Sequence, residues 1–559
     1  MFSTFMMVSS TLVYLFINSF FTGSTMLELK LFSSNNMDIS VSLIFDYISL
    51  GFFSSVSVIS GVVFMYSVFY MQGTMDLRRF SYLVLMFVLS MMILVFSGNF
   101  FMTMVGWDGL GLVSFCLVVF YMNSPSLESG LITVFSNRVG DVFFLCTFMF
   151  MFYSGTFSYE FVLKGKFLMI STILFMGAMT KSAQLPFMAW LPAAMAAPTP
   201  VSSLVHSSTL VTAGVYVLIR YNYLFNYMKS FTMSILFVMT MVLAGGVAVM
   251  ETDLKKVVAM STLSQLGMMM TIMSVGGWLM AFIHMMIHAF FKSMLFLSTG
   301  SLMSQISGSQ DSRIYGSDLS SYTSMLFFVV SSVCLAGFPF FIGFYSKDFI
   351  ITFSSTSEGL SIFYLFMTGC LMTVAYSARL LWEGYFAAMK APLPATKTES
   401  MEFILPVSLL FMKCWLLGGV FYWIFLTEMN YLFQLMDLMM GVILLVLGTT
   451  LFVTMKFDYT LISLLGTLFF FRWFTSSAAS STMDKYFYQK FENTWMEVLG
   501  GQGVSSIMFV INKKLNTMNS IMLGLLVLSM TSLMMTMKYL ESFYNVSFEG
   551  AKESMGSGF

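Results

Sequence analysis

Long apolar runs follow one another along almost the whole chain, with short polar stretches between them. Of the 559 residues, 58% are hydrophobic and 9% are charged, and the mean hydropathy is +0.86. A run of about 20 apolar residues has the length of a helix that crosses a bilayer. Backbone groups in a bilayer are satisfied only in helices or closed barrels, and these runs lack the alternation of barrel strands. We therefore expect an all-α, polytopic membrane protein of about 15–16 transmembrane helices.

Composition and motif content exclude several classes of protein. Lys plus Arg equal Asp plus Glu at 26 each, so no basic excess points to nucleic acid. The five cysteines are widely separated inside apolar runs, which excludes the clustered spacing of iron–sulfur and zinc sites. No phosphate-binding GxxxxGKS or GxxxxGKT motif occurs. We expect neither nucleotides nor nucleic acid to bind this chain.

The hydrophobic stretch 181–220 contains four prolines and ionisable residues. Lys181 lies five residues before the first proline, where a helix has to break, and His206 follows the last proline in an apolar segment. Ionisable groups inside membrane helices are expensive and usually functional. The stretch therefore predicts a proton or ion path through a bilayer. The alternative for Lys181 is a lysine that snorkels to the membrane surface.

Two carboxylates lie in apolar segments that precede this stretch. Asp108 belongs to GWDGLGLVSF, near the start of its segment, and Asp141 belongs to NRVGDVFF, three residues after Arg138. Charges at the centre of a membrane helix cost roughly 2.5–3.5 kcal/mol each on insertion scales, so they have to be paired or hydrated. A cap at a helix end is the alternative for Asp108, and a local pair with Arg138 is the alternative for Asp141.

The segment LMAFIHMMIHAFFKSMLF carries three titratable residues at intervals of four. His284, His288 and Lys292 would project from one face of a single helix. Two histidines without a nearby carboxylate are a weak zinc signal, so metal binding remains an alternative, as do histidines that only pack in the core. A proton relay explains the aligned lysine together with both histidines, and we prefer it.

A second apolar stretch, AGFPFFIGFYSKDFIITF, is interrupted as the first one is. Gly337 and Pro339 precede Lys347 and Asp348 within it. Paired interruptions in two halves of a transporter usually mark its binding path. We interpret the chain as two halves that contribute titratable groups to one path, although sequence likeness between the halves is very weak.

Several motifs carry a family resemblance: WDGLGLVSF, NRVGD, KSAQLPF, DLKKVVAMSTLSQLG, HAFFKSMLF and GFYSKD. Together they closely resemble the antiporter-like subunit 5 family of mitochondrial NADH:ubiquinone oxidoreductase, respiratory complex I. The likeness is strong over about residues 75–385 and weaker through the C-terminal third. It implies a proton-translocating core subunit of the membrane arm in the mitochondrial inner membrane, a multi-pass protein. NADH oxidation and ubiquinone reduction would take place elsewhere in the complex.

The resemblance implies two inverted five-helix repeats with broken helices, followed by a lateral amphipathic helix. The expected parts are N-terminal transmembrane helices in 1–97, a first antiporter-like repeat in 98–225, a second in 226–385, additional transmembrane helices in 386–455, an amphipathic lateral helix in 456–515, and a C-terminal anchoring helix with a polar tail in 516–559.

The family's proton relay, carried over by resemblance, falls on Asp108, Asp141, Lys181, His206, His284, His288, Lys292 and Lys347. In this relay a charge that separates Asp108 from Lys181 would push the lysine proton toward His206. The chain itself would hold no cofactor and no metal, and FMN, iron–sulfur clusters and ubiquinone are expected in partner subunits. The expected partners are other membrane-arm subunits, especially the neighbouring antiporter-like subunits, together with membrane lipids.

The chain departs from the family pattern at three positions. Asp108 and Ala196 stand where many members carry glutamate, and Met188 stands where many carry histidine. A relay step through Met188 or Ala196 cannot operate, so water or Ser and Thr hydroxyls would have to bridge there. We also expect one helix fewer before Asp108 than in vertebrate members. The first apolar run has no basic residue before it and is expected to be retained as a spanning helix.

Two other functions remain open from the sequence. A cation/proton antiporter subunit of a multi-subunit sodium/proton exchanger would share the broken helices and the lysines. A structural clamp would use the lateral segment 456–515 to hold neighbouring subunits together.

Overall fold

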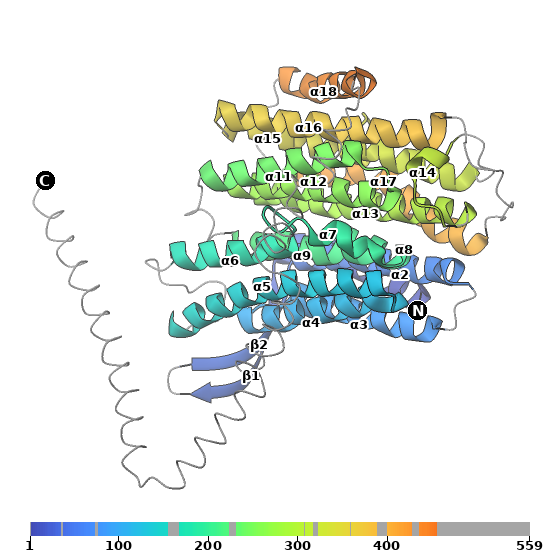
Figure 1. Ribbon diagram of the computed structural model, residues 1–559. Helices are drawn as coiled ribbons and strands as arrows, with labels where there is room; N and C mark the ends of the chain where they lie inside the picture. The colour runs from blue at the N-terminus through green and yellow to red at the C-terminus, as the bar shows by residue number, and fades with distance from the viewer. Residues whose placement is uncertain are drawn as a thin grey trace, which may run out of the picture. The chain divides into compact units, whose positions relative to one another are not determined.

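The computed structural model describes residues 2–34, 37–72, 76–154, 167–222, 231–306, 308–316, 322–357, 359–387, 400–426 and 435–454. All of them belong to one compact unit. Its long helices run with nearly parallel axes, as Figure 1 shows. The expected lateral helix in 456–515 and anchoring helix in 516–559 lie outside the described residues.

The N-terminal half alternates long helices with one hairpin and one broken region. Its elements are α1 (Phe2–Thr22), β1 (Thr25–Ser34), β2 (Met37–Phe45), α2 (Tyr47–Tyr70), α3 (Leu77–Phe96), α4 (Phe100–Val118), η1 (Val119–Tyr121), α5 (Ser124–Ser154), α6 (Phe167–Lys181), α7 (Trp190–Ala193), η2 (Ala194–Ala196), α8 (Thr199–Val201), the π-helical η3 (Ser202–Thr209) and α9 (Leu210–Arg220).

The second half is helical throughout its described ranges. Its elements are α11 (Phe231–Met250), α12 (Leu254–Val275), α13 (Trp278–Gln305), η4 (Ser312–Ile314), α14 (Tyr322–Ala336), α15 (Ile342–Ser357), α16 (Leu360–Leu381), η5 (Trp382–Phe386), α17 (Met401–Leu426) and α18 (Leu435–Thr454).

The apolar runs of the sequence are the helices of the structure. Within the described ranges, nine helices are long and apolar enough to cross a membrane, and shorter apolar helices accompany them. The all-α membrane fold is therefore confirmed, including both interruptions: α6 ends at Lys181, and α14 ends at Ala336 before α15 begins. The division into repeats at 98–225 and 226–385 stays a prediction.

The apolar runs of the sequence did not predict the antiparallel hairpin β1–β2. Thr25 pairs with Phe45 at its open end, and β2 ends directly before α2 begins at Tyr47. The sequence does carry the signal, because LELK and ISVS alternate apolar and polar residues. Hydropathy averaged over a window of helical length does not show this alternation.

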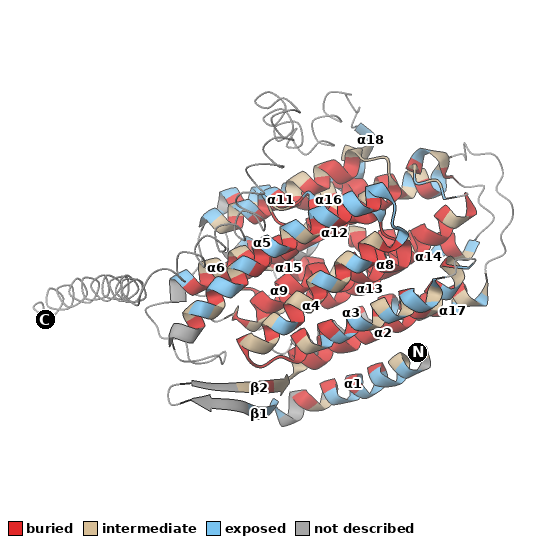
Figure 2. Cartoon of the chain, turned by 60° about the horizontal axis from the view of Figure 1, so that its bottom comes forward, coloured by how far each residue is buried: buried red, intermediate tan, exposed pale blue. Residues whose placement is uncertain are grey.

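The interior is formed by α2, the continuous span α8–η3–α9, α12 and α13, which are buried along nearly their whole length (Figure 2). Helix α13 packs against α2, α12, η3, α15 and α17. By contrast, α3, α4 and α5 expose one face. The helix with the aligned histidines thus lies at the centre of the bundle, where its polar groups meet protein on all sides.

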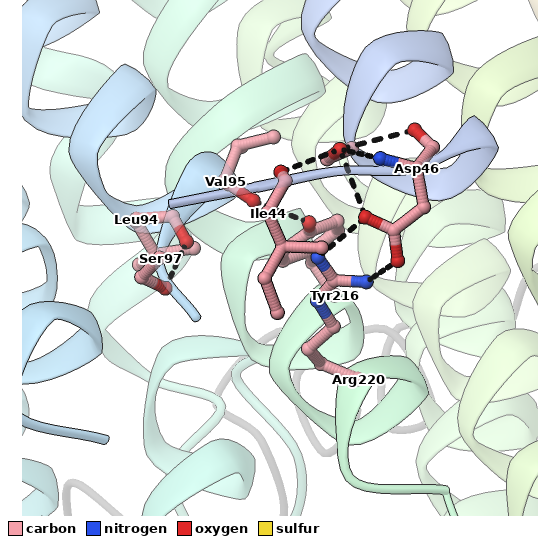
Figure 3. A network of polar contacts seen from close by, with 8 residues as sticks. Ile44, Asp46, Leu94, Val95, Ser97, Tyr216 and Arg220 are labelled. Atoms are coloured by element: carbon pink, nitrogen blue, oxygen red, sulfur yellow. Dashed lines mark hydrogen bonds and ion pairs between the residues drawn. The ribbon is translucent and has the colours of Figure 1, made fainter. Parts of the chain in front are cut away.

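A buried ion pair fixes the end of α9 (Figure 3). Arg220, at the end of α9, donates from Nη1 and Nη2 to the two Asp46 carboxylate oxygens at 2.5 and 3.1 Å. One turn earlier, the Tyr216 hydroxyl donates to the Val95 carbonyl at 2.7 Å. The start of α2, the end of α3 and the end of α9 are thereby joined at one point.

Candidate functional site

The first break places Lys181 at the end of α6 with its side chain fully buried. Its ammonium donates to the Trp107 carbonyl oxygen at 2.6 Å and lies 3.8 Å from the centre of the Trp107 ring. The Trp190 indole donates to the Thr180 carbonyl at 2.9 Å, which satisfies a backbone group freed by the break. Lys181 does not reach the surface, so the snorkelling alternative is excluded.

The carboxylates gather beside Trp107 on α4 and α5. The Trp107 indole donates to Asp141 Oδ1 at 3.0 Å, and Arg138 Nη1 lies 3.1 Å from Asp141 Oδ2. Arg138 also lies 4.0 Å from Asp108 Oδ1. The local Arg138–Asp141 pair is therefore present, whereas Asp108 lies inside α4 and not at a helix end.

Asp108 and Lys181, which we expected to be neighbours, do not contact each other directly in this structure. Among the described residues, no nitrogen–oxygen contact within 4.0 Å joins Lys181 to Asp108 or to Asp141. Trp107 is the residue that both sides of this cluster touch. It holds the lysine through its backbone oxygen and ring, and it holds Asp141 through its indole nitrogen.

His206 lies in the π-helical turn η3, buried and apart from the lysine. Within the described part of the chain neither ring nitrogen has a hydrogen-bond partner, and the nearest aromatic ring recorded is that of Trp190, with centroids 6.2 Å apart. The element that carries His206, η3, packs against α13, which carries the histidine stripe. Met188 is buried and Ala196 is exposed, and neither carries a group that can hold a proton.

The three titratable residues of α13 are buried as a stripe, but their surroundings differ. His284 contacts Ser346 through Nδ1 at 2.9 Å and Gln265 through Nε2 at 3.1 Å. Lys292 donates to the Ser261 hydroxyl at 2.5 Å. His288 has no hydrogen-bond partner among the described residues, and its ring meets the edge of Phe291.

The metal-binding alternative concerns the two histidines of this stripe. In the ranges that the structure describes, no group of three His, Cys, Asp or Glu residues is placed to hold a metal ion. The His284 nitrogens, moreover, are both engaged by neighbouring side chains.

The second break surrounds the ammonium of Lys347 with oxygen atoms. It donates to the Leu335 and Ala336 carbonyls at 3.3 and 3.1 Å and to the Thr373 hydroxyl at 2.7 Å. These carbonyls are freed because α14 ends there, and Gly337 follows with φ +83°, the left-handed conformation that favours glycine. A Cβ atom at Gly337 would lie 3.0 Å from the Lys347 side chain, so this position also leaves room for the lysine.

Several polar residues of the site escaped the sequence analysis. They are Trp107, Ser261, Gln265, Ser346, Thr373 and Tyr376, all of them buried. A signal exists in α12, where Ser261, Ser264 and Gln265 follow the i, i+3, i+4 spacing of one helix face inside an apolar run. Polar residues on a helix face that meets α13 are the expected partners of its titratable groups.

Family sequence models match most of the described chain. Residues 97–373 match the family described as "NADH:quinone oxidoreductase/Mrp antiporter, TM", and residues 31–81 match the N-terminus of NADH-ubiquinone oxidoreductase (complex I) chain 5. The chain is 38% identical over 502 residues to NADH-ubiquinone oxidoreductase chain 5 of Anopheles gambiae, covering 86% of this chain and 87% of that one. The chain belongs to the NADH-ubiquinone oxidoreductase chain 5 family. The Lumbricus terrestris member is 36% identical over 564 residues and covers 94% of this chain and 96% of its own.

Solved structures share the fold of this chain 5 family member. A chain of the Mrp complex from a Dietzia species superposes with a TM-score of 0.68 at 23% identity, over 89% of this chain and 60% of that one. A chain of the membrane-bound sulfane sulfur reductase, an archaeal respiratory membrane complex, gives a TM-score of 0.67 at 18% identity, over 80% and 93%. At these identities the likeness establishes the antiporter-like fold, and membership of a multi-subunit membrane complex follows from the family.

Proposed function

We propose that this chain conducts protons across the mitochondrial inner membrane as a membrane-arm subunit of respiratory complex I. NADH oxidation and quinone reduction take place in partner subunits, which hold FMN, iron–sulfur clusters and ubiquinone. The chain carries no redox centre in this proposal. Its part is to supply a path whose charged groups respond to events in its neighbours.

The observation that carries the proposal is the state of the buried lysines. Lys181, Lys292 and Lys347 are all buried, and none has a carboxylate oxygen within 4.0 Å among the described residues. Their recorded hydrogen-bond acceptors are neutral oxygens: the Trp107 carbonyl, the Ser261 hydroxyl, and the carbonyls and hydroxyl around Lys347. A buried lysine that only stabilised the fold would be paired, because an unpaired buried charge is costly. Lysines held by neutral oxygens can release and regain a proton.

The order of the titratable groups supports a path. The Trp107 cluster leads to Lys181, η3 with His206 packs against α13, and α13 packs against α15, which carries Lys347. The same π-helical segment carries buried hydroxyl side chains close to His206 in the sequence, including Ser203, Ser207 and Thr209. These hydroxyls and internal water are the bridges that replace the absent histidine and glutamate at Met188 and Ala196.

The outer face of α4 and α5 points to a neighbouring subunit. Asp108 and Arg138 are each 48% exposed there, among exposed apolar side chains such as Leu112, Phe135 and Val142. A half-exposed charged pair in the middle of spanning helices requires a polar cover. We propose that an adjacent antiporter-like subunit supplies it, which would let that subunit act on Asp108 and, through Trp107, on Lys181.

A cation/proton antiporter subunit is the second candidate. The family description that matches residues 97–373 includes Mrp antiporters, and the Dietzia Mrp chain shares the fold. Purification separates the two: flavin and iron–sulfur absorbance in the purified assembly supports complex I, whereas an assembly without those cofactors supports the exchanger.

The test of the proposed path is NADH-driven proton uptake in proteoliposomes that contain the assembled complex. Lys181→Ala is compared with Lys256→Ala, which removes a half-exposed lysine beside Asp253. We expect proton uptake to be lost in Lys181→Ala at matched assembly and to be unchanged in Lys256→Ala. Wild-type uptake in Lys181→Ala would instead make Lys181 a structural lysine and the chain a brace for protons that travel elsewhere.

A further inference from the structure

A chain of hydrogen-bonded side chains from α12 and α16 ends on the ring of His284. The Ser264 hydroxyl lies 2.9 Å from the Ser261 carbonyl oxygen and 2.9 Å from the Tyr376 hydroxyl. The amide nitrogen of Gln265 lies 3.3 Å from the same Tyr376 hydroxyl, and the amide oxygen lies 3.1 Å from His284 Nε2. All of these groups are buried.

Counting protons along this chain fixes the direction of each hydrogen bond. A carbonyl oxygen can only accept, so Ser264 uses its one proton on Ser261 and has to accept from Tyr376. Tyr376 then has no proton left and accepts from Gln265. The amide nitrogen of Gln265 therefore faces Tyr376, and its oxygen faces His284, which has to donate from Nε2.

The other ring nitrogen of His284 faces the second break. Nδ1 lies 2.9 Å from the Ser346 hydroxyl, whereas that hydroxyl is 3.4 Å from the Gly343 carbonyl. The shorter contact makes His284 the better acceptor for the serine proton. Ser346 directly precedes Lys347, so the accepting nitrogen of a neutral His284, Nδ1, lies on the side of the Lys347 break.

We propose that Gln265 and Tyr376 are positioning residues that hold neutral His284 with its proton on Nε2 and its lone pair on Nδ1. This inference rests on the proposed function. In this state His284 takes up a proton at Nδ1, through Ser346, and becomes an imidazolium. Because Gln265 holds the Nε2 proton in place, His284 gives its extra proton back from Nδ1. The pair thus keeps this ring ready to accept and return a proton on the side of Lys347.

Two substitutions at Gln265 separate this role from packing. Gln265→Met keeps the volume but removes the acceptor for His284 Nε2, whereas Gln265→Glu keeps an acceptor oxygen and brings a charge into a buried site. The measurement is the initial rate of NADH-driven proton uptake by the assembled complex in proteoliposomes, from pH 6 to 8. We expect Gln265→Met to slow uptake about tenfold and to change its pH profile, because a buried donor loses its partner. Gln265→Glu is expected to keep most of the rate.

A higher rate of proton uptake in Gln265→Met than in Gln265→Glu would overturn the proposal, because a site that only packs tolerates methionine better than a buried carboxylate. Wild-type rates in both variants would overturn it as well. If both variants are slow, Tyr376→Phe decides, with Tyr216→Phe as the control for loss of a buried tyrosine hydroxyl elsewhere. A slow Tyr376→Phe beside a normal Tyr216→Phe supports the proposal, and a normal Tyr376→Phe rejects it.

A third variant, His284→Leu, distinguishes failure of the positioning role from failure of the proposed function. Lost uptake in His284→Leu with normal uptake in Gln265→Met contradicts only the positioning role. Normal uptake in His284→Leu contradicts the relay itself.

Discussion

The residue that organises the first charged cluster is an aromatic one. Trp107 is buried, stacks on Phe144 with ring centroids 3.9 Å apart, and contacts both Lys181 and Asp141. Its backbone oxygen holds the lysine without a counter-charge, and its indole nitrogen holds the carboxylate. Trp107 thus links Asp141 to Lys181 without a direct ion pair between them.

Replacement of Trp107 by phenylalanine tests this link. Trp107→Phe keeps a ring near the Lys181 ammonium and the backbone oxygen but removes the hydrogen bond to Asp141, which is worth about 1.5–3 kcal/mol for a charged acceptor. We expect proton uptake to fall roughly tenfold while the complex still assembles. Trp415→Phe, at an exposed ring on α17, is the control and should pump normally. Normal pumping in Trp107→Phe would show that Asp141 and Lys181 work independently.

At the scale of elements, the breaks depend on close helix contacts. Gly214 of α9 lies against α6 just before Lys181, and a Cβ atom there would come within 2.7 Å of the Ala178 carbonyl oxygen. Backbone cannot give way as a flexible side chain can. The absence of a side chain at Gly214 is therefore what lets α9 pack closely against the end of α6 at the first break.

Gly214→Ala and Gly111→Ala should have opposite effects on stability. Alanine gains roughly 0.5–1 kcal/mol over glycine inside a helix, and Gly111 on α4 has open space around its Cβ position, so that variant should be slightly more stable. At Gly214, overpacking costs about 1–3 kcal/mol and outweighs this gain. Thermal unfolding of the purified complex, read as loss of this subunit, measures both. Equal stability of the two variants would contradict the close contact.

For the whole described unit, distant segments are joined by few polar contacts. Asp46 and Arg220 are far apart in sequence and come from the end of the hairpin and the end of α9. Their side chains are 18% and 8% exposed, so the pair is largely withdrawn from solvent. It holds the start of α2 in place against the end of α9.

Removal of one partner of this ion pair should destabilise the protein more than removal of both partners. A single Arg220→Leu or Asp46→Asn change leaves an uncompensated buried group, at a cost of about 3–5 kcal/mol, whereas replacement of both partners costs less. The measurement is a double-mutant cycle on the thermal stability and yield of the assembled complex. Additive losses in the double variant would show that the two side chains do not interact in the assembled protein.

The candidate site was predictable in its residue types but not in its contacts. Asp141, Lys181, His284 and Lys292 stand out in the sequence because ionisable groups are rare in apolar runs. Their partners did not stand out. Ser261 and Tyr376 are ordinary residues of membrane helices. Only the packing of α12 against α13 brings Ser261 to Lys292, and only the packing of α16 against α12 brings Tyr376 to Gln265, which contacts His284.

The sequence alone determined the environment, the helical fold and the two breaks. Runs of apolar residues, and prolines and glycines beside buried charges, leave a chain in a bilayer few other choices. Tertiary structure alone decided that Trp107 stands between Lys181 and Asp141, that an alternating segment forms a hairpin, and that Gln265 faces His284. The reason is physical: helix formation and burial depend on neighbours along the chain, whereas a hydrogen bond depends on atoms that only packing brings together.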